Sequence, residues 1–260
     1  MARQRLGQHF LGNPGWRKRI LDTLPLDATE TWIEIGAGHG EMTELLAPRV
    51  RRLVAIETDH RLLPWLRERA ADEWPNVEIA GGDVLALDLA ALAAGERFRV
   101  YGNLPYYITT PILKHVFSYA SLVRSLHIVI QLEVAERLAA HPGHREYGSL
   151  SAFCQFYSKP EIALRVPPGA FQPPPRVKSA LVKLTLPGER ASLGVGDEPR
   201  FLEFIHHCFG QKRKTLKNNL RAIAPARHIE QALAAAHLRL DARAEQLTLE
   251  QFAALFAQLA

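Results

Sequence analysis

The stretch from Thr31 to Gly40 limits the possible folds more than any other part of this sequence. Its first half, Thr31–Ile35, is mostly apolar and is typical of a strand buried in a parallel sheet. Its second half has glycine at positions 36, 38 and 40, which permits a tight turn and close approach of a ligand before a helix. A second apolar run, residues 53–56, ends at Glu57, about 20 residues after the first glycine, where an acid in nucleotide-binding folds accepts hydrogen bonds from ribose. We therefore predict a strand–helix–strand unit with a ribose acceptor.

Two features of this turn bear on the cofactor that it can hold. A dinucleotide places its pyrophosphate at the helix N-terminus, where a carboxylate at Glu34 would repel it. S-adenosylmethionine instead carries an ammonium and a sulfonium group. The glycines also follow G-x-G-x-G and not the G-x-G-x-x-G of dinucleotide-binding folds. The pattern favours S-adenosylmethionine over NAD, and a glycine turn of purely structural use is the remaining alternative.

Composition sets the class of partner and compartment. The 260 residues include 32 Lys and Arg against 27 Asp and Glu, and a net charge of +5 favours an anionic partner such as nucleic acid. Cys154 and Cys208 are the only cysteines, so we expect two core thiols, with no disulfide framework. The 11 histidines show no ligand spacing, and we expect no metal site. No secretory signal and no run of ~20 apolar residues is evident, so we expect a cytoplasmic protein without membrane association.

The order of the predicted elements indicates a mostly parallel sheet with helices on both faces. Glu34, Glu57, Asp83 and Asn103 each fall at the end of a predicted strand, where ligands bind in such sheets. Strands are predicted at residues 31–35, 53–56, 77–80, 98–101 and 126–131, and helices at 16–24, near Glu41, after Asp59 as a possible cap, from Thr110, and beyond Gly148.

The remainder of the chain predicts a smaller helical domain. Two further strands, 161–166 and 179–186, flank a proline-rich loop at 167–175, and residues 187–199 are the best linker candidate. Apolar periodicity then predicts helices at 200–209, 215–223, 229–236 and 249–259. We therefore predict a nucleotide-binding domain over residues 1–187 and a small helical domain over residues 188–260.

The tetrapeptide Asn103-Leu-Pro-Tyr106 carries the most specific chemistry. The exocyclic nitrogen of adenine is a poor nucleophile, and an enzyme can help by accepting hydrogen bonds from its N–H groups as charge develops. The side-chain oxygen of Asn103 and the carbonyl of Leu104, held extended before proline, would form such a pair. Tyr106 would stack on the flipped base. The alternative is a turn in which Asn103 bonds its own backbone. Its place after the fourth strand favours catalysis.

Taken together, these motifs resemble the ribosomal RNA adenine N6-dimethyltransferases, most of all those of the bacterial small subunit. The resemblance runs from residue 6 to residue 218 in order, and it implies a class I S-adenosylmethionine-dependent methyltransferase, a Rossmann-like α/β sheet with a small C-terminal helical domain. The matching segments are Leu6-Gly-Gln-His-Phe-Leu11, Glu34-Ile-Gly-Ala-Gly-His-Gly40, Glu57-Thr-Asp59, Gly82-Asp83, Asn103-Leu-Pro-Tyr106, Phe171-Gln-Pro-Pro-Pro-Arg-Val177 with Ser179, and Lys212-Arg-Lys-Thr-Leu-Lys-Asn218.

The resemblance implies roles for single residues. Glu57 would hold the cofactor ribose and Asp83 the amino group of its adenine. Phe171 would lie over the target base, opposite Tyr106, although an aromatic residue in a proline-rich loop is often a packing anchor. The residues implied to contact S-adenosylmethionine are His9, Leu11, Gly36, Glu57, Asp83 and Asn103.

The implied function is N6,N6-dimethylation of two adjacent adenosines in a hairpin loop near the 3′ end of 16S rRNA, within partly assembled small ribosomal subunits, by an enzyme that we expect to be a monomer. The alternatives are a large-subunit rRNA methyltransferase of the antibiotic-resistance type, a non-catalytic assembly factor, and, more remotely, a nicotinamide dehydrogenase. The chain departs from the family pattern in four places, with His9 where Asn is frequent, Ala37 for Pro, Tyr107 for Asn and Lys178 for Asp.

A basic segment near the C-terminus predicts RNA contact. Leu216, Leu220 and Ile223 would form one helix face, with basic residues on the other. No acid occurs between Glu203 and Glu230, which suits a phosphate backbone better than an ordinary solvated face. The basic residues of that face are Lys214, Lys217 and Arg221.

Overall fold

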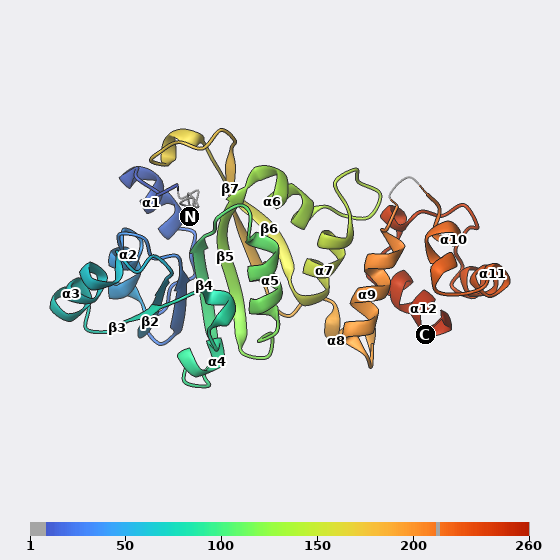
Figure 1. Cartoon of the computed structure of the whole chain (residues 1–260), viewed down its shortest axis with the longest axis horizontal. Coiled ribbons are helices and arrows are strands. Elements are labelled where there is room, and N and C mark those ends of the chain that lie inside the picture. The colour runs from blue at the N-terminus through green and yellow to red at the C-terminus, as the bar shows by residue number, and fades with distance from the viewer. Residues whose placement is uncertain (1–8, 212–213, 260) are drawn as a thin grey trace, which may run out of the picture. The chain divides into compact units, whose positions relative to one another are not determined.

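The computed structural model describes residues 9–211 and 214–259 (Figure 1). The motif residues 6–8 and the basic residues Lys212 and Arg213 lie outside this part of the chain. The described residues form two compact units, each with its own core. The first extends to Ala135 and includes Pro160–Leu186, and the second comprises Glu136–Lys159 and the residues from Pro187 onward.

The first unit is built on a seven-stranded sheet with the order β3-β2-β1-β4-β5-β7-β6. The first five strands are mutually parallel, and β7 runs antiparallel to β5. Because β1 and β4 are neighbours, the chain reverses its direction of winding between β1 and β4, and a crevice opens at their carboxyl ends. The strands are β1 Thr31–Ile35, β2 Arg52–Glu57, β3 Val77–Gly81, β4 Phe98–Asn103, β5 Val123–Gln131, β6 Lys159–Val166 and β7 Ser179–Thr185.

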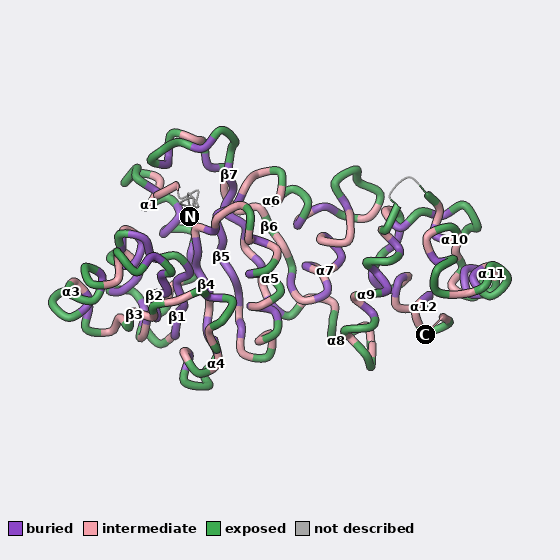
Figure 2. The backbone as a smooth tube through the Cα atoms, viewed as in Figure 1, coloured by how far each residue is buried: buried purple, intermediate pink, exposed green. Residues whose placement is uncertain are grey.

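The strands at the centre of the sheet consist mostly of buried apolar residues. All five residues of β1 are buried, as are all residues of β2 after Arg52, so the central strands have helices or loops on both faces (Figure 2). The helical elements of this unit are α1 Pro14–Leu21, α2 Thr43–Leu46, η1 Ala47–Arg49, α3 Leu63–Glu73, η2 Val84–Ala86, α4 Leu89–Leu92, α5 Thr109–Phe117 and η3 Pro168–Ala170.

Two helix starts differ from the predictions. The helix after the glycine turn, α2, is a single turn. It continues into the 3₁₀ turn η1, and Pro48 is the second residue of η1. Asp59 does not cap α3, because its Oδ1 accepts from the backbone N–H of Arg61, before the helix begins. The prediction of Asp59 as a cap was therefore wrong.

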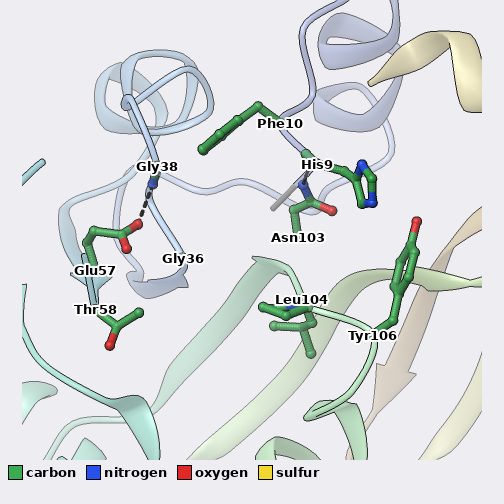
Figure 3. A pocket seen from close by; sticks show the side chains of 10 residues that line it. His9, Phe10, Gly36, Gly38, Glu57, Thr58, Asn103, Leu104 and Tyr106 are labelled. Carbon is green, nitrogen blue, oxygen red and sulfur yellow. Dashed lines mark hydrogen bonds between the residues drawn. The ribbon is translucent and has the colours of Figure 1, made fainter. Parts of the chain in front are cut away.

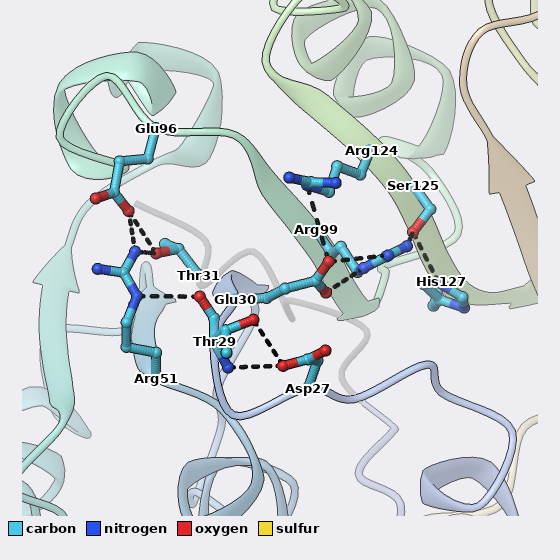
Figure 4. A network of polar contacts seen from close by, with 10 residues as sticks. All are labelled: Asp27, Thr29, Glu30, Thr31, Arg51, Glu96, Arg99, Arg124, Ser125 and His127. Atoms are coloured by element: carbon cyan, nitrogen blue, oxygen red, sulfur yellow. Dashed lines mark hydrogen bonds and ion pairs between the residues drawn. The ribbon is translucent and has the colours of Figure 1, made fainter.

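A polar network joins the amino ends of the strands (Figure 4). The guanidinium of Arg99, at the start of β4, donates to both carboxylate oxygens of Glu30 at 2.5 and 3.0 Å. Arg99 also donates to Ser125 of β5 at 2.9 Å, and Ser125 contacts buried His127, whose pKa is lowered to about 3 by burial. This end of the sheet is thus occupied by structural contacts, which leaves the carboxyl ends for ligands.

The second unit is helical and has a continuous apolar core. Phe156 packs on Phe201 with ring centroids 5.6 Å apart, and Tyr147 packs on Phe209 at 5.9 Å. Residues 136–159, which we assigned to the first domain, therefore pack with the second unit. Its helices are the end of α6 Leu132–Ala139, then α7 Ser149–Tyr157, α8 Arg190–Leu193, α9 Glu198–Cys208, α10 Leu216–Asn219, η4 Leu220–Ala222, α11 Ala226–Ala235, η5 Ala244–Gln246 and α12 Leu249–Leu259.

The predicted linker is partly structured, since residues 187–199 contain α8 and the first two residues of α9. Cys154 and Cys208 are both free and buried, which confirms the prediction of core thiols. In the part of the chain that the structure describes, no helix has the length and apolar character that a membrane span requires.

Candidate active site

A pocket lies at the carboxyl ends of β1, β2 and β4 (Figure 3). Four segments far apart in the sequence meet there: the N-terminal arm, the glycine turn, the end of β2 and the residues after β4. The lining residues are His9, Phe10, Gly36, Gly38, Glu57, Thr58, Asn103, Leu104, Pro105 and Tyr106.

The glycine turn and Glu57 form one hydrogen-bonded unit. The carboxylate of Glu57 accepts from the backbone N–H of Gly38 at 2.7 Å and from that of Asp59 at 2.8 Å. Gly36 and Gly38 have φ angles of +79° and +60°, which other residues rarely adopt. A Cβ atom at Gly38 would lie 2.9 Å from the ring of Phe10. The turn therefore requires glycine, and Glu57 fixes its shape with its side chain 2% exposed.

Glu34 does not face the pocket, and this corrects part of our sequence argument. It is 2% exposed and accepts a hydrogen bond from the Thr43 hydroxyl at 2.6 Å. Burial raises its pKa to about 8, so the side chain is largely uncharged at neutral pH. Repulsion between Glu34 and a pyrophosphate is therefore no argument against a dinucleotide.

The N-terminal arm, residues 9–13, is pinned to the loop at residues 170–173. Phe10 and Gln172 exchange two backbone hydrogen bonds, 3.1 and 2.8 Å long, and Asn13 donates to Ala170 at 3.2 Å. Nδ1 of His9 lies 2.8 Å from the carbonyl oxygen of Pro173. The arm thereby forms one wall of the pocket.

Asn103 is held in a defined orientation by this arm. Its Nδ2 donates to the carbonyl of His9 at 2.8 Å. A carbonyl only accepts, so this contact selects the orientation in which Oδ1 points away from the arm. The Leu104 N–H donates to Val129 at 3.1 Å, which fixes the following peptide. Within the described residues neither Asn103 Oδ1 nor Leu104 O accepts a hydrogen bond, so both acceptors are available to a ligand.

Tyr106 is half-buried at the edge of the pocket. Its hydroxyl lies 2.8 Å from Oγ of Ser179, and burial raises its pKa above the ordinary value. The ring of His9 is stacked beside that of Tyr106, with centroids 5.9 Å apart and an interplanar angle of 27°. Figure 3 shows His9 between Asn103 and Tyr106. One face of Tyr106 is thus in contact with the arm.

Three predicted site residues lie outside the pocket lining. Phe171 is 4% exposed and belongs to the apolar core of the first unit, as does Leu11, also 4% exposed. Asp83 is exposed at the end of β3, and its Oδ1 accepts from the N–H of Leu85 at 3.0 Å. The structure therefore brings together His9, Gly36, Glu57, Asn103, Leu104 and Tyr106 of the predicted set.

Sequence reasoning assigned no role to several residues that the structure brings to the site. Phe10 and Thr58 line the pocket, and Ser179 contacts Tyr106 from the start of β7. Each of these residues lies within a sequence motif that we had recognised, so its place in a motif could have marked it as a site residue. The contacts that it makes are known only from the structure.

The basic segment of the second unit is less free than its sequence suggests. Leu216 and Leu220 are buried as predicted, but Ile223 is 39% exposed. Lys217 forms an ion pair with Glu230 of α11. Lys214 and Arg221 are exposed and make no ion pair with any residue in the described ranges.

The strand order, the glycine turn after β1, the acid at the end of β2 and the pocket above them define a class I methyltransferase. Residues 1–260 match the model of a family described as ribosomal RNA adenine dimethylase. The chain belongs to this family. The predicted fold class and enzyme class, an rRNA adenine dimethyltransferase, are confirmed.

Relatives cover nearly the whole chain. The ribosomal RNA small subunit methyltransferase A of Acidobacterium capsulatum is 45% identical over 98% of this chain and 90% of its own length. The enzyme of the same name from Koribacter versatilis is 41% identical over 98% of this chain and 93% of its own length. Among solved structures, a dimethyladenosine transferase from Plasmodium falciparum aligns with a TM-score of 0.83 and 24% identity over 96% of each chain. The 23S rRNA methyltransferase ErmE aligns with a TM-score of 0.73 and 27% identity, over 96% of this chain and 99% of its own chain.

Proposed function

We propose that this enzyme transfers methyl groups from S-adenosylmethionine to N6 of two adjacent adenosines in a hairpin loop near the 3′ end of 16S rRNA, two methyls to each. The observation that carries the proposal is the pair of available acceptors, Asn103 Oδ1 and Leu104 O, next to Tyr106 at the pocket edge. We expect the enzyme to act as a cytoplasmic monomer on partly assembled small subunits.

The residues of the pocket fit S-adenosylmethionine. Glu57 offers carboxylate oxygens to ribose hydroxyls, and an added Cβ at Gly36 would project toward the carbonyl of Asn103, 3.8 Å away, so its absence leaves room for a ligand. Asp83 uses one oxygen within its turn, which leaves the other for the amino group of the cofactor adenine. His9 and Leu11 would complete the site from the arm. When bound, the cofactor supplies an electrophilic methyl group.

Asn103 and Leu104 would make the adenine amino group a better nucleophile. Each of their oxygens accepts one N–H of the amino group, which directs the nitrogen lone pair out of the ring plane as charge develops. The Asn103–His9 contact holds the amide so that oxygen and not NH₂ meets the substrate. In this scheme the acceptors act mainly in the transition state, and the methylated nitrogen then loses one of its protons to water.

Tyr106 and Phe171 would stack on the two faces of the flipped base. Tyr106 is already fixed by its hydrogen bond to Ser179. Phe171 is buried, so its contact with a base requires the loop at residues 170–173 to move relative to the arm, while the His9 carbonyl stays on Asn103. The ring of His9 would turn away from Tyr106 without loss of that backbone contact.

The small-subunit substrate is favoured over the large-subunit alternative by identity. The relatives named for the small subunit are 41–45% identical to this chain, whereas the 23S methyltransferase is 27% identical. A non-catalytic assembly factor is disfavoured because Glu57, Asn103 and Tyr106 all line one pocket.

The test is methyl transfer in vitro. Partly assembled small subunits and large-subunit RNA are offered separately with labelled S-adenosylmethionine, and the modified nucleosides are identified by mass spectrometry. We expect N6,N6-dimethyladenosine at two adjacent positions of the small-subunit RNA. Preferential labelling of large-subunit RNA would refute the substrate, and binding of NAD in place of S-adenosylmethionine by calorimetry would refute the cofactor.

A further inference from the structure

Two chain segments meet at the edge of the pocket and carry side chains with no role in the scheme above. The hydrogen bond between Tyr106 and Ser179 joins the segment after β4 to the first residue of β7. Ser179 is fully buried and pairs with Gln131 in the sheet, and the carbonyl of Lys178 accepts from Leu132 at 2.9 Å. The backbone on both sides of this hydrogen bond is therefore fixed next to the base-binding Tyr106.

Tyr107 is the exposed ring of this region. Its side chain is 64% exposed, more than any other large apolar or aromatic side chain in the described ranges, and it makes no ring contact or hydrogen bond there. A single exposed aromatic residue is unremarkable on most surfaces. This one directly follows a residue that lines the pocket.

Arg176 and Lys178 add unpaired positive charge. Both are exposed, and neither forms an ion pair with a residue that the structure describes. No acid occurs in the sequence between Glu161 and Glu189. Arg61 of the same unit, in contrast, is paired with Asp59. The combination of a free ring with free cations and no nearby acid in sequence is complementary to a base and its phosphates.

We propose that Tyr107, with Arg176 and Lys178, binds the unpaired nucleotide adjacent to the target adenosine. This inference depends on the proposed function, because it assumes that Tyr106 holds the flipped base. Tyr107 stacks on the neighbouring base while the two cations contact its flanking phosphates. Because the proposed substrate has two adjacent target adenosines, this subsite would hold one of them while the other is methylated.

The first test separates stacking from charge. Tyr107→Ala should lower affinity for a small-subunit hairpin RNA about 5-fold to 100-fold, the usual range for losing one base stack, and Tyr107→Phe should restore it. Arg176→Ala with Lys178→Ala should reduce the slope of log affinity against log salt by about 1.4 for a single strand. Cofactor affinity and melting temperature should stay at wild-type values.

The matched control removes the same charge at the amino end of the sheet. Arg49 and Arg97 are exposed residues that precede β2 and β4. Arg49→Ala with Arg97→Ala should leave the salt slope as in the wild type. An equal loss of slope in the two double variants would refute the phosphate contacts, because total charge would then explain the effect.

The decisive experiment pairs Tyr107 with the neighbouring base. Hairpin RNA in which the nucleotide next to the target lacks its base should bind the wild-type enzyme as weakly as intact RNA binds the Tyr107→Ala variant. The same abasic change should cost the variant nothing further. Additive losses, or no loss in Tyr107→Ala, would overturn this inference while wild-type methylation stood. Failure of the wild-type enzyme to methylate small-subunit RNA would instead overturn the proposed function.

Discussion

Asn103 carries a donor and an acceptor on one side chain, and our proposal uses both. Its NH₂ group donates to the arm at His9, and we propose that its oxygen accepts from the substrate. An Asp at this position could not donate to a carbonyl unless it were protonated, and a Ser could not reach both partners. The residue type is therefore determined by the site and not by the turn in which it lies.

Asn103→Ala should reduce methyl transfer at saturating cofactor by about 100-fold or more, the loss seen when one preorganised transition-state hydrogen bond is removed. The dissociation constant of S-adenosylmethionine should change much less, because the lost contact forms mainly in the transition state. Single-turnover transfer and calorimetry measure the two quantities. Wild-type turnover in this variant would rule out the catalytic assignment.

Glu57→Ala should have the opposite effect and weaken cofactor binding first. In our proposal the carboxylate contacts the ribose equally in ground and transition states, and in the structure it supports the turn through Gly38. We expect the dissociation constant to rise by about 10-fold or more, as for a hydrogen bond to a charged group. Glu68→Gln, on the exposed surface of α3, is the control, and an unaltered constant in Glu57→Ala would contradict the role.

Tyr106 and Ser179 can be tested as a pair. Tyr106→Phe and Ser179→Ala each remove the same hydrogen bond and keep the ring, so each should slow transfer to RNA about 2-fold to 10-fold. The double variant should be no slower than the single ones, because only one contact is lost. Multiplying losses would indicate that the two hydroxyls act separately.

At the scale of the elements, strands were easier to predict than contacts. The buried runs around Ile33 and Val54 are long and apolar enough to be recognised, and Glu57 and Asn103 mark where those strands end. The glycine turn was recognisable from glycines at positions 36, 38 and 40, and all three have positive φ angles. The place of the pocket at the carboxyl ends of β1, β2 and β4 could therefore be predicted from the strand ends.

The errors at this scale have a common cause. Glu34 was expected to face the cofactor, but it bonds to Thr43, nine residues along the chain. His9 contacts Asn103 and Pro173 at separations of 94 and 164 residues. The local sequence pattern carries no information on such distant partners. The direction in which a side chain points could therefore not be predicted, even where its place at a strand end was.

Glu34 also links β1 to α2 in a pH-dependent way. Its pKa is raised from 4.5 to about 8, so the folded state binds this proton more tightly than the unfolded chain. The contribution is fully present below the unfolded pKa and is lost as the pH rises through the folded value, at about 1.4 kcal/mol for each unit of difference. Glu34→Gln should flatten the fall in unfolding free energy between pH 5 and pH 8. Urea unfolding at several pH values across this range measures the unfolding free energy. If that free energy falls as steeply with pH in Glu34→Gln as in the wild type, the raised pKa of Glu34 is contradicted.

At the scale of the whole molecule, the two units divide chemistry from substrate choice in our proposal. The residues of the pocket all lie in the first unit. The second unit offers the exposed cations Lys214 and Arg221, while Lys217 is neutralised by Glu230. The sequence suggested three phosphate contacts in this segment, and from the ion pair of Lys217 we now expect two.

The last prediction follows from that difference. Lys214→Ala with Arg221→Ala should reduce the slope of log affinity for RNA against log salt by about 1.4 to 1.8, at ~0.7 to 0.9 per contact. Lys217→Ala alone should change the slope little, because its charge is already paired. Cofactor affinity should be unchanged in both variants. We propose that these phosphate contacts position the RNA loop at Asn103. The double variant should therefore also lose its preference for small-subunit particles over large-subunit RNA in a salt series with labelled methyl donor. An equal effect of Lys217→Ala and of the double variant would show that the ion pair does not decide which cations meet the RNA.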